Sequence, residues 1–442
     1  MMNKILYKNL NILDPTGSTG FLPHTWISVI DGIIDQVGPG AIPTEKFDEI
    51  YDLQGKTVMP GMINAHTHLY SALALGMPYP PKLPRNFKEI LENIWWKLDL
   101  ALDEDSTAAS FQAGLLLNLL AGVTTVLDHH SSQNFIRGST ARLVATAEQY
   151  GLRAATAFEL TDRNGPRRFL EGLAENCDAL QTYKNHPLVH PLMGLHASFT
   201  LSDDSLTAIA QRLADLNYPG IHIHIGEDLA DQEDAVRRGY RSVIDRLNSF
   251  GLITANSLLI HGIYLQPDDI QIIQEKKAFL VHCPSSNANN RVGMLAAHTI
   301  EKLQAGLGTD GMQANMRTEV KEGQLIRSSH LQGGEPNVDY SQLLFKNNPH
   351  LASRLFDQKI GRIEAGCVAD LAVYDYSPHT NLKSSNALSH VIWGLPLPCH
   401  VITGGVFRIR DHKLVGIDMD LILGNARAES EKLWAEMQQI GV

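Results

Sequence analysis

Two short segments of this sequence place pairs of histidines where they could bind a metal ion. His66 and His68 are separated by one residue after an apolar run, and His222 and His224 repeat that spacing. Residues two apart on a β-strand point to the same face, so each pair can present two imidazoles to one site. Two such imidazoles, a third from another strand and a carboxylate make a metal site that leaves one position open for water.

Asp310 is the candidate carboxylate, since it stands between small residues in the segment Gly-Thr-Asp-Gly at 308–311. An Asp-Gly pair is also common in turns, so this motif becomes informative only beside the histidine pairs. His224 is the preferred ligand of its pair because it lies nearer the end of its segment, three residues before Glu227. His222 would lie deeper, and we expect it to be a hydrogen-bonded core histidine.

The elements that would position these residues are eight apolar, strand-like runs in the middle of the chain, which alternate with amphipathic helical stretches. Most runs begin about 20–40 residues after the previous one, the size of a βα unit. The pattern predicts the α/β class and a (β/α)8 TIM barrel whose parallel sheet is buried on both faces; a doubly wound open sheet is the alternative. The runs are Val58–His66, Thr124–His130, Arg153–Leu160, Leu188–Phe199, Gly220–Glu227, Ser257–Tyr264, Ala278–Asn287 and Ala305–Gly311.

Toward the C-terminal end of seven of the eight runs we single out histidines or carboxylates as candidate functional groups. In a barrel these ends meet on one rim, where catalytic groups converge. A random distribution of histidine would not favour the same end of so many strands. The residues are His66 with His68, His129 with His130, His196, Glu227, His261, His282 and Asp310.

Both ends of the chain contain short β-like runs that differ from the middle. These short runs, separated by turn dipeptides, predict a small antiparallel sheet. Neither end is large enough to bury a stable core alone, so we expect them to form one small β-sandwich domain together. We expect this domain to comprise 1–58 and 365–442, with the barrel at 59–364 and a final helix at about Asp418–Gln439.

The gap from Leu69 to Val123 is too long for one helix. It contains a proline-rich stretch and the pair Trp95-Trp96. We expect an inserted lid over the strand ends.

The composition excludes several classes of protein. The 442 residues include 44% hydrophobic and 19% charged residues, an ordinary globular balance. A net charge of -11 offers no excess of Lys and Arg to displace counterions, which disfavours a nucleic-acid binder. The 4 Cys form no CxxC pair, and the sequence contains neither a signal-peptide pattern nor an 18-residue apolar stretch. We expect a soluble, cytoplasmic protein with no membrane partner.

Five motifs in this order resemble the deaminase and chlorohydrolase branch of the amidohydrolase superfamily, and the resemblance covers nearly the whole chain. They are PGMINAHTHL (60–69), HIHIGED (222–228), HGIYL (261–265), HCPSSN (282–287) and GLGTDG (306–311). A closer resemblance is to aminohydrolases of the SsnA type. It rests on NIWWKLDLALDEDS (93–106), VLDHHSS (126–132), FELTDRNG (158–165), HGIYLQPDDI (261–270) and SSNANNRVG (285–293).

The resemblance implies one divalent metal ion per chain. Two-metal members of the superfamily place a carboxylated Lys or a Glu at the end of strand 4, and the run Leu188–Phe199 contains neither. Zinc is the first choice because it suits imidazole ligands and needs no redox chemistry; iron(II), which some relatives use, is the alternative. The implied ligands are His66, His68, His224 and Asp310.

The resemblance also assigns roles in hydrolysis. Asp310 would accept a proton from water, His261 would orient that water, and Glu227 would shuttle protons to a ring nitrogen and then to the leaving amine. The expected reaction is hydrolytic deamination of an aminated N-heterocycle, purine- or pterin-like, with release of ammonia. Dechlorination of a triazine and ring opening of a cyclic amide remain as alternatives, and so does a catalytically silent scaffold or binding protein.

The substrate contacts are expected on the same rim. His196 matches a position where related deaminases contact the substrate, and one residue of the pair His129 and His130 is expected to face the pocket. Trp95 or Trp96 could stack on a flat ring, although paired tryptophans in a helix are more often core residues. The charged rim residues Glu159, Arg163 and Arg291 could read a polar ring edge. The expected partner is a small heterocyclic molecule. A homodimer is also expected, because dimers are the commonest oligomers of soluble proteins.

Overall fold

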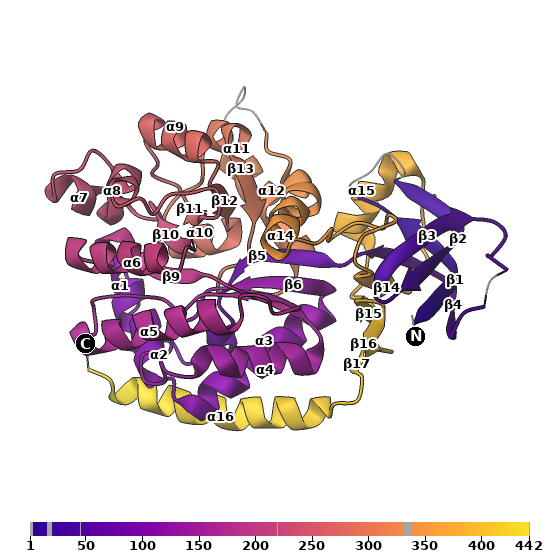
Figure 1. The fold of residues 1–442 in the computed structure, drawn as a ribbon, viewed down its shortest axis with the longest axis horizontal. Coiled ribbons are helices and arrows are strands. Elements are labelled where there is room, and N and C mark those ends of the chain that lie inside the picture. The colour runs from indigo at the N-terminus through magenta and orange to yellow at the C-terminus, as the bar shows by residue number, and fades with distance from the viewer. Residues whose placement is uncertain (1–2, 16–19, 45, 219, 331–336, 442) are drawn as a thin grey trace.

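The structure is a computed structural model that describes residues 3–15, 20–44, 46–218, 220–330 and 337–441. Its strands form three sheets: a four-stranded and a five-stranded parallel sheet from the middle of the chain, and an eight-stranded sheet from its two ends. Figure 1 shows the terminal sheet at one end of the molecule, beside the helices that surround the parallel sheets. The predicted α/β class is confirmed.

All eight predicted runs contain strands of the two parallel sheets. The run Leu188–Phe199 contains two strands, separated by Leu192, because it changes its partner from β7 to β10 at that point. The four-stranded sheet has the order β5 (Met62–Thr67), β6 (Val123–Asp128), β7 (Arg153–Thr156), β8 (Val189–Pro191). The other sheet has the order β13 (Gln304–Leu307), β12 (Phe279–His282), β11 (Leu258–His261), β10 (Ile221–Ile225), β9 (Met193–Ala197).

Helices cover these strands, which explains why the strands read as apolar runs. Ile223, Leu259 and Leu280 are fully buried at the centre of the five-stranded sheet. Strands buried on both faces need apolar residues at successive positions. The helices are α3 (Glu104–Leu120), α4 (Ser139–Tyr150), α5 (Pro166–Thr182), α6 (Asp203–Asp215), α7 (Leu229–Arg237), α8 (Val243–Ser249), α9 (Pro267–Lys276), α10 (Pro284–Asn290), α11 (Ala297–Lys302), α12 (Met316–His330) and α14 (Asn348–Phe356).

The two ends of the chain pair in one sheet, as the sequence predicts. Strand β14 (Leu371–Tyr374) lies antiparallel to β4 (Glu49–Pro60). The expectation of a purely antiparallel sheet is wrong, because β1 (Lys4–Leu13) runs parallel to β4. The hairpin of β2 (Phe21–Ile30) and β3 (Ile33–Pro39) lies between them in the sequence and returns the chain in the starting direction. The remaining strands are β15 (His400–Thr403), β16 (Val406–Arg410) and β17 (Lys413–Leu414).

The last helix, α16 (Met419–Gln439), crosses from the terminal sheet to the helices around the parallel sheets (Figure 1). It begins where Asp418 accepts hydrogen bonds from the N–H groups of Asp420 and Leu421. Nε1 of Trp434 donates a 2.9 Å hydrogen bond to the carbonyl of Leu73, so the end of the chain contacts a segment that follows β5.

The segment between β5 and β6 contains several short helices, as its length predicts. They are η1 (Leu69–Ala74), α1 (Phe87–Ile90), η2 (Leu91–Trp95) and α2 (Trp96–Ala101), followed by α3. Within the described ranges, none of the helices combines the length and apolar character that a membrane span requires.

Candidate active site

The ends of β5, β10 and β13 bring the four predicted metal ligands together. His66, His68, His224 and Asp310 each offer one ligand atom, and these atoms all lie within 4.8 Å of one another. Asp310 follows β13 with a φ of 54°, a left-handed conformation that is uncommon outside glycine. Its position is fixed by a parallel bridge between Thr67 and Asp310.

The three imidazoles are oriented through their Nδ1 atoms. Nδ1 of His68 lies 2.6 Å from the carbonyl oxygen of His129, and Nδ1 of His224 lies 2.9 Å from that of His196. Nδ1 of His66 lies 2.9 Å from Nε2 of His222, which is fully buried as expected. Each contact leaves Nε2 to face the centre of the group, the arrangement in which partners behind the ligands fix the ring orientation.

The donor set fits a divalent cation such as zinc. Nε2 of His66 is buried without a hydrogen bond and lies 3.5 Å from Oδ1 of Asp310, which is 2.8 Å from Nε2 of His68. Burial lowers the pKa of His66 to about 3 and that of His224 well below its usual value, so both rings are neutral, as metal ligands must be. Burial alone would raise the pKa of Asp310, but its contacts with His66 and His68 hold that pKa well below the usual range.

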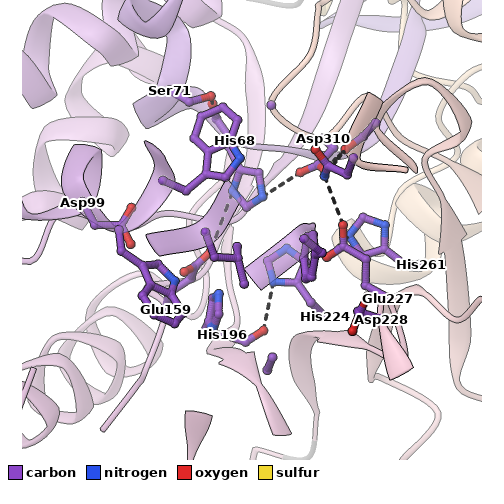
Figure 2. A pocket seen from close by; sticks show the side chains of 18 of the residues that line it. His68, Ser71, Asp99, Glu159, His196, His224, Glu227, Asp228, His261 and Asp310 are labelled. Atoms are coloured by element: carbon purple, nitrogen blue, oxygen red, sulfur yellow. Dashed lines mark hydrogen bonds and ion pairs between the residues drawn. The ribbon is translucent and has the colours of Figure 1, made fainter. Parts of the chain in front are cut away.

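Glu227 and His261 lie next to Asp310 on one side of the pocket (Figure 2). Nε2 of His261 is 3.4 Å from Oε2 of Glu227, and Nδ1 of His261 is 2.8 Å from Oδ1 of Asn287. Burial raises the pKa of Glu227 to about 7, although the charge of His261 opposes the shift. A carboxyl group with this pKa can donate or accept a proton near neutral pH, as a general acid or base must.

The segment between β5 and β6 supplies one wall of the pocket. Phe87, Leu91, Trp95 and Trp96 line it, opposite the strand ends. The predicted contacts His196 and Trp95 therefore both face the pocket, and His196 is held by a 3.0 Å contact between its Nδ1 and Oγ1 of Thr200. This geometry agrees with the expectation that the inserted segment lies over the strand ends.

Four predicted substrate contacts do not line the pocket: His129, His130, Arg163 and Arg291. His129 is fully buried below it, with Nδ1 3.0 Å from Oε1 of Glu159 and Nε2 3.1 Å from the carbonyl oxygen of His222. His130 packs among aromatic rings, with Nε2 2.8 Å from Oγ of Ser132. Arg291 is exposed where α10 ends. The two histidines directly follow β6, which ends at Asp128, and both are buried.

A second possible ligand group consists of His68, His129, Glu159 and His224. It shares two histidines with the first group, and their Nδ1 atoms already face carbonyl oxygens. Only His129 and Glu159 are then left for another ion, which is fewer than a metal site needs. The second group is therefore incomplete as an independent metal site.

Several residues at the pocket carried no signal in the sequence. Tyr70, Ser71 and Asp99 come from the inserted segment, and Asp231 is in the first turn of α7. Ser286 and Asn290 also line the pocket, and their spacing of four in a short helix after β12 could have indicated a common face.

Comparisons with known proteins agree with this fold. A model of the amidohydrolase family matches residues 57–395. A 5-methylthioadenosine/S-adenosylhomocysteine deaminase of Syntrophomonas wolfei is 26% identical over 445 residues, which cover 97% of this chain and 99% of that protein. An adenosine deaminase structure from Xanthomonas campestris with bound zinc has a TM-score of 0.83 at 21% identity, covering 98% of this chain and 99% of that one.

A mutant atrazine chlorohydrolase of Arthrobacter aurescens, complexed with zinc and atraton, has a TM-score of 0.82 at 18% identity. The match covers 96% of this chain and all of that one. At these identities the solved structures establish the fold alone, whereas the match to the family model establishes the family. Because that model covers well over half of the sequence, the chain belongs to the amidohydrolase family.

Proposed function

We propose that this protein is a metal-dependent hydrolytic deaminase that acts on an aminated N-heterocycle, purine-like or pterin-like, and releases ammonia. The observation that carries the proposal is the position of Glu227. Its carboxyl group lies beside His261 and within 4.8 Å of Asp310, next to three histidines that can bind a metal ion. The deaminase names of the relatives support a purine ring, and a hydrolase acting on C–N bonds is the class common to them.

The metal ion in this proposal is zinc, one per chain, with iron(II) as the alternative. His66, His68, His224 and Asp310 would hold it. When bound, a divalent metal supplies Lewis acidity, which makes water a nucleophile near neutral pH. The zinc in two solved structures of this fold supports the choice.

The side chains of the site divide the proton transfers among them. Asp310 accepts a proton from the attacking water, and His261, held at Nδ1 by Asn287, orients that water. Glu227 in its neutral form protonates a ring nitrogen and becomes a carboxylate. It then takes the proton of the newly added hydroxyl group and passes it to the departing amine, so that ammonia leaves, and the proton held by Asp310 restores neutral Glu227. His196 and Trp95 contact the ring of the substrate.

Hydrolytic dechlorination is the second candidate, because the chlorohydrolase of Arthrobacter aurescens shares the fold. Chloride needs no proton to leave, whereas an amine does, so the buried Glu227 favours deamination. A two-metal ring-opening hydrolase is disfavoured because neither β8 nor β9 contains Lys or Glu. A catalytically silent scaffold protein is disfavoured because each predicted ligand is in place.

We also propose that the two parallel sheets close into the predicted (β/α)8 barrel at 59–364. The adjoining strands β8 and β9 are edge strands of different sheets, and the bridge from Thr67 to Asp310 connects the other two edges. In the same proposal, the terminal sheet of 1–58 and 365–442 is a small sandwich around an apolar cluster that includes Tyr7, Val58 and Leu371.

Replacing Glu227 with Gln tests the proposed function. Loss of a general acid lowers the rate by about 10²–10⁴-fold, so ammonia release should fall by that factor while the metal content stays at about one ion per chain. The assay is ammonia release from aminated purines, pterins, pyrimidines and triazines, with absorbance followed in parallel. Glu233→Gln, on the exposed face of α7, is the matched control.

A Glu227→Gln variant with full activity would remove Glu227 from the proposed role. A spectral change without ammonia would favour dechlorination or ring opening. Two tightly bound metal ions in the wild-type protein would contradict the single-metal assignment.

A further inference from the structure

Many carboxyl groups line the pocket. Six acidic residues line it, and none of its described lining residues is Lys or Arg. Glu227 and Asp310 lie on the side of the pocket where the reaction is proposed, and Asp228 follows Glu227 in the sequence. The acidic residues are Asp99, Glu159, Glu227, Asp228, Asp231 and Asp310.

Asp99 and Glu159 lie on the side of the pocket opposite Glu227 and Asp310 (Figure 2). Both are only 2% exposed. Oδ1 of Asp99 is buried and has no hydrogen-bond partner among the described residues. The proposed chemistry uses neither residue, so a buried acceptor of Asp99 is left on the side of the pocket opposite Glu227, while Glu159 lies 3.8 Å from Nδ1 of His68.

Arg163 and His129, the basic groups nearest to this side, already have partners. Nη2 of Arg163 lies 3.1 Å from Oδ2 of Asp99, Nε of Arg163 donates to Oγ1 of Thr161 at 3.0 Å, and its guanidinium lies 4.6 Å from the centre of the Trp96 ring. Both nitrogens of His129 face acceptors, one of them Oε1 of Glu159 at 3.0 Å. Neither group lines the pocket, so neither can bind a phosphate or a carboxylate of the substrate.

We propose that this side of the pocket selects substrates by charge: the heterocycle carries no phosphate or carboxylate, and the part of it that lies opposite Glu227 offers hydrogen-bond donors or a positive charge to Asp99 and Glu159. The inference rests on the proposed deaminase function, whose substrate class it narrows. An anionic group placed there would lose its water without gaining a cationic partner. A hydroxyl or ammonium group would instead satisfy the unpaired oxygen of Asp99.

A matched series of ligands tests the selection. It consists of an aminopurine ribonucleoside, its 5′-amino-5′-deoxy derivative and its 5′-monophosphate, all with the same reacting ring. We expect kcat/KM for the monophosphate to be at least about 30-fold below that of the nucleoside, because like charges placed together in a binding site cost several kcal/mol. The amino derivative should equal or exceed the nucleoside.

Two substitutions should relax the selection, because each removes a carboxylate charge from this side of the pocket. Asp99→Asn leaves the charge of Arg163 unpaired, and Glu159→Gln removes the carboxylate that faces Nδ1 of His129. Each should narrow the ratio between nucleoside and monophosphate by about fivefold or more and should weaken the amino derivative. Glu431→Gln, on the exposed surface of α16, is the control and should leave the ratio unchanged.

Binding measurements separate this inference from the proposed function. Calorimetric titration of the same three ligands into the zinc-loaded Glu227→Gln protein measures charge preference without turnover. If the ligands bind in the expected order but no ammonia is released by the wild type, the function fails and the charge selection stands. Equal affinity for the monophosphate and the nucleoside, or an unchanged ratio in both variants, would overturn the charge selection.

Discussion

At the scale of single residues, the site is organised by hydrogen bonds that lie behind the reacting groups. His68 and His224 use Nδ1 on carbonyl oxygens, and His261 uses Nδ1 on Asn287, so each ring presents Nε2 to the pocket. Glu227 is held in the same way, since Nδ2 of Asn290 donates to its Oε1 at 3.2 Å. This amide helps to position the carboxyl group of Glu227 and lowers its pKa.

This contact gives a prediction about pH. Glu227 must be protonated to act as an acid, so kcat/KM of the wild type should fall as the pH rises through about 7, the pKa to which burial raises this group. The hydrogen bond from Asn290 favours the ionised form and lowers the pKa. Asn290→Ala should therefore raise the pKa and move the descending limb of the profile to higher pH by ~0.5 unit or more.

The measurement is the pH dependence of kcat/KM, which reports the pKa values of the free enzyme. A lower overall rate in the variant does not affect the position of the limb. Gln271→Ala, on the exposed side of α9, should leave the profile unchanged. A limb that stays in place or moves to lower pH would show that another group controls it.

The sequence could predict the residues whose position follows from strand alternation. His66, His68 and His224 lie on strands or directly after them, where a period of two determines the face. The same rule could not place His129 and His130, which follow the last residue of β6. There the backbone leaves the strand, and the direction of each side chain depends on contacts with other elements.

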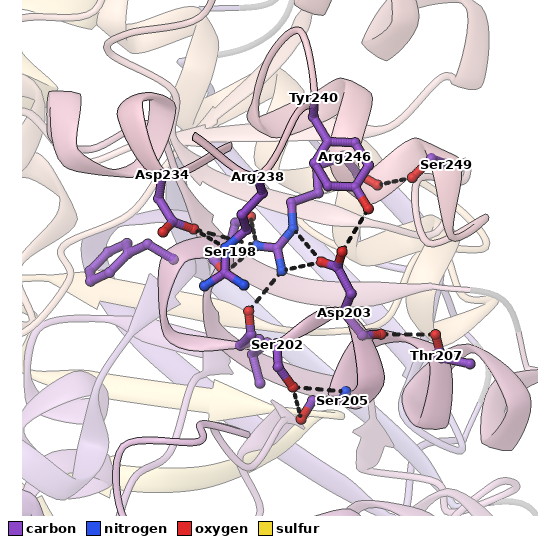
Figure 3. Close-up of polar contacts among 12 residues, drawn as sticks. Ser198, Ser202, Asp203, Ser205, Thr207, Asp234, Arg238, Tyr240, Arg246 and Ser249 are labelled. Carbon is purple, nitrogen blue, oxygen red and sulfur yellow. Dashed lines mark hydrogen bonds and ion pairs between the residues drawn. The ribbon is translucent and has the colours of Figure 1, made fainter. Parts of the chain in front are cut away.

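At the scale of elements, a buried arginine connects three helices to the turn that follows β9. Figure 3 shows Arg246 of α8 among these groups. Nη1 donates to the carbonyl of Ser198 at 2.7 Å, and Nη2 donates to the carbonyl of Leu201 and to Oδ1 of Asp203, both at 2.8 Å. The turn η3 (Ser198–Thr200) that it holds contains the pocket residue Phe199 and follows His196 of β9, which also lines the pocket.

Arg246→Leu should destabilise the protein by about 2–4 kcal/mol, since it leaves the carbonyl groups of Ser198 and Leu201 without their donor, whereas the paired carboxylate of Asp203 is 45% exposed and contributes little. Chemical denaturation of the metal-loaded protein measures this loss. Arg241→Leu is the matched control from the same region: Arg241 is 69% exposed and pairs with Asp245 at 2.6 Å. An exposed pair contributes at most about 1 kcal/mol. Equal losses in the two variants would contradict the role of the buried network.

The sequence could predict the strands but not this network. Apolar runs such as Leu258–His261 carry their own signal, because both faces of the strand are covered. Arg246 belongs to a short amphipathic helix in which an arginine is expected to face solvent. Its burial depends on carbonyl groups of a turn that is more than 40 residues away in the chain, and no local pattern reports them.

At the scale of the whole molecule, one carboxylate connects the terminal sheet to the parallel sheets. Oδ2 of Asp370 lies 2.6 Å from Nη1 of Arg153 in β7, and both side chains are buried. Oδ1 of Asp370 accepts from the N–H of Gly404, and its carbonyl accepts from the N–H of Gly61, both at 2.8 Å. The short β-like runs at both ends of the sequence predict that the two ends pair. The ion pair, however, spans 217 positions and has no local signal in the sequence.

Because the two parts share this buried contact, we expect them to unfold together. The wild-type protein should show one denaturation transition, with hydrogen exchange in β1 and in β11 reporting the same opening free energy. Asp370→Ala removes the partner of Arg153 and should cost about 3–5 kcal/mol in both regions. Asp375→Ala, exposed just beyond the other end of β14, is the control and should change neither. Loss of protection confined to the terminal sheet, with β11 unaffected, would mean that the two parts are stabilised independently.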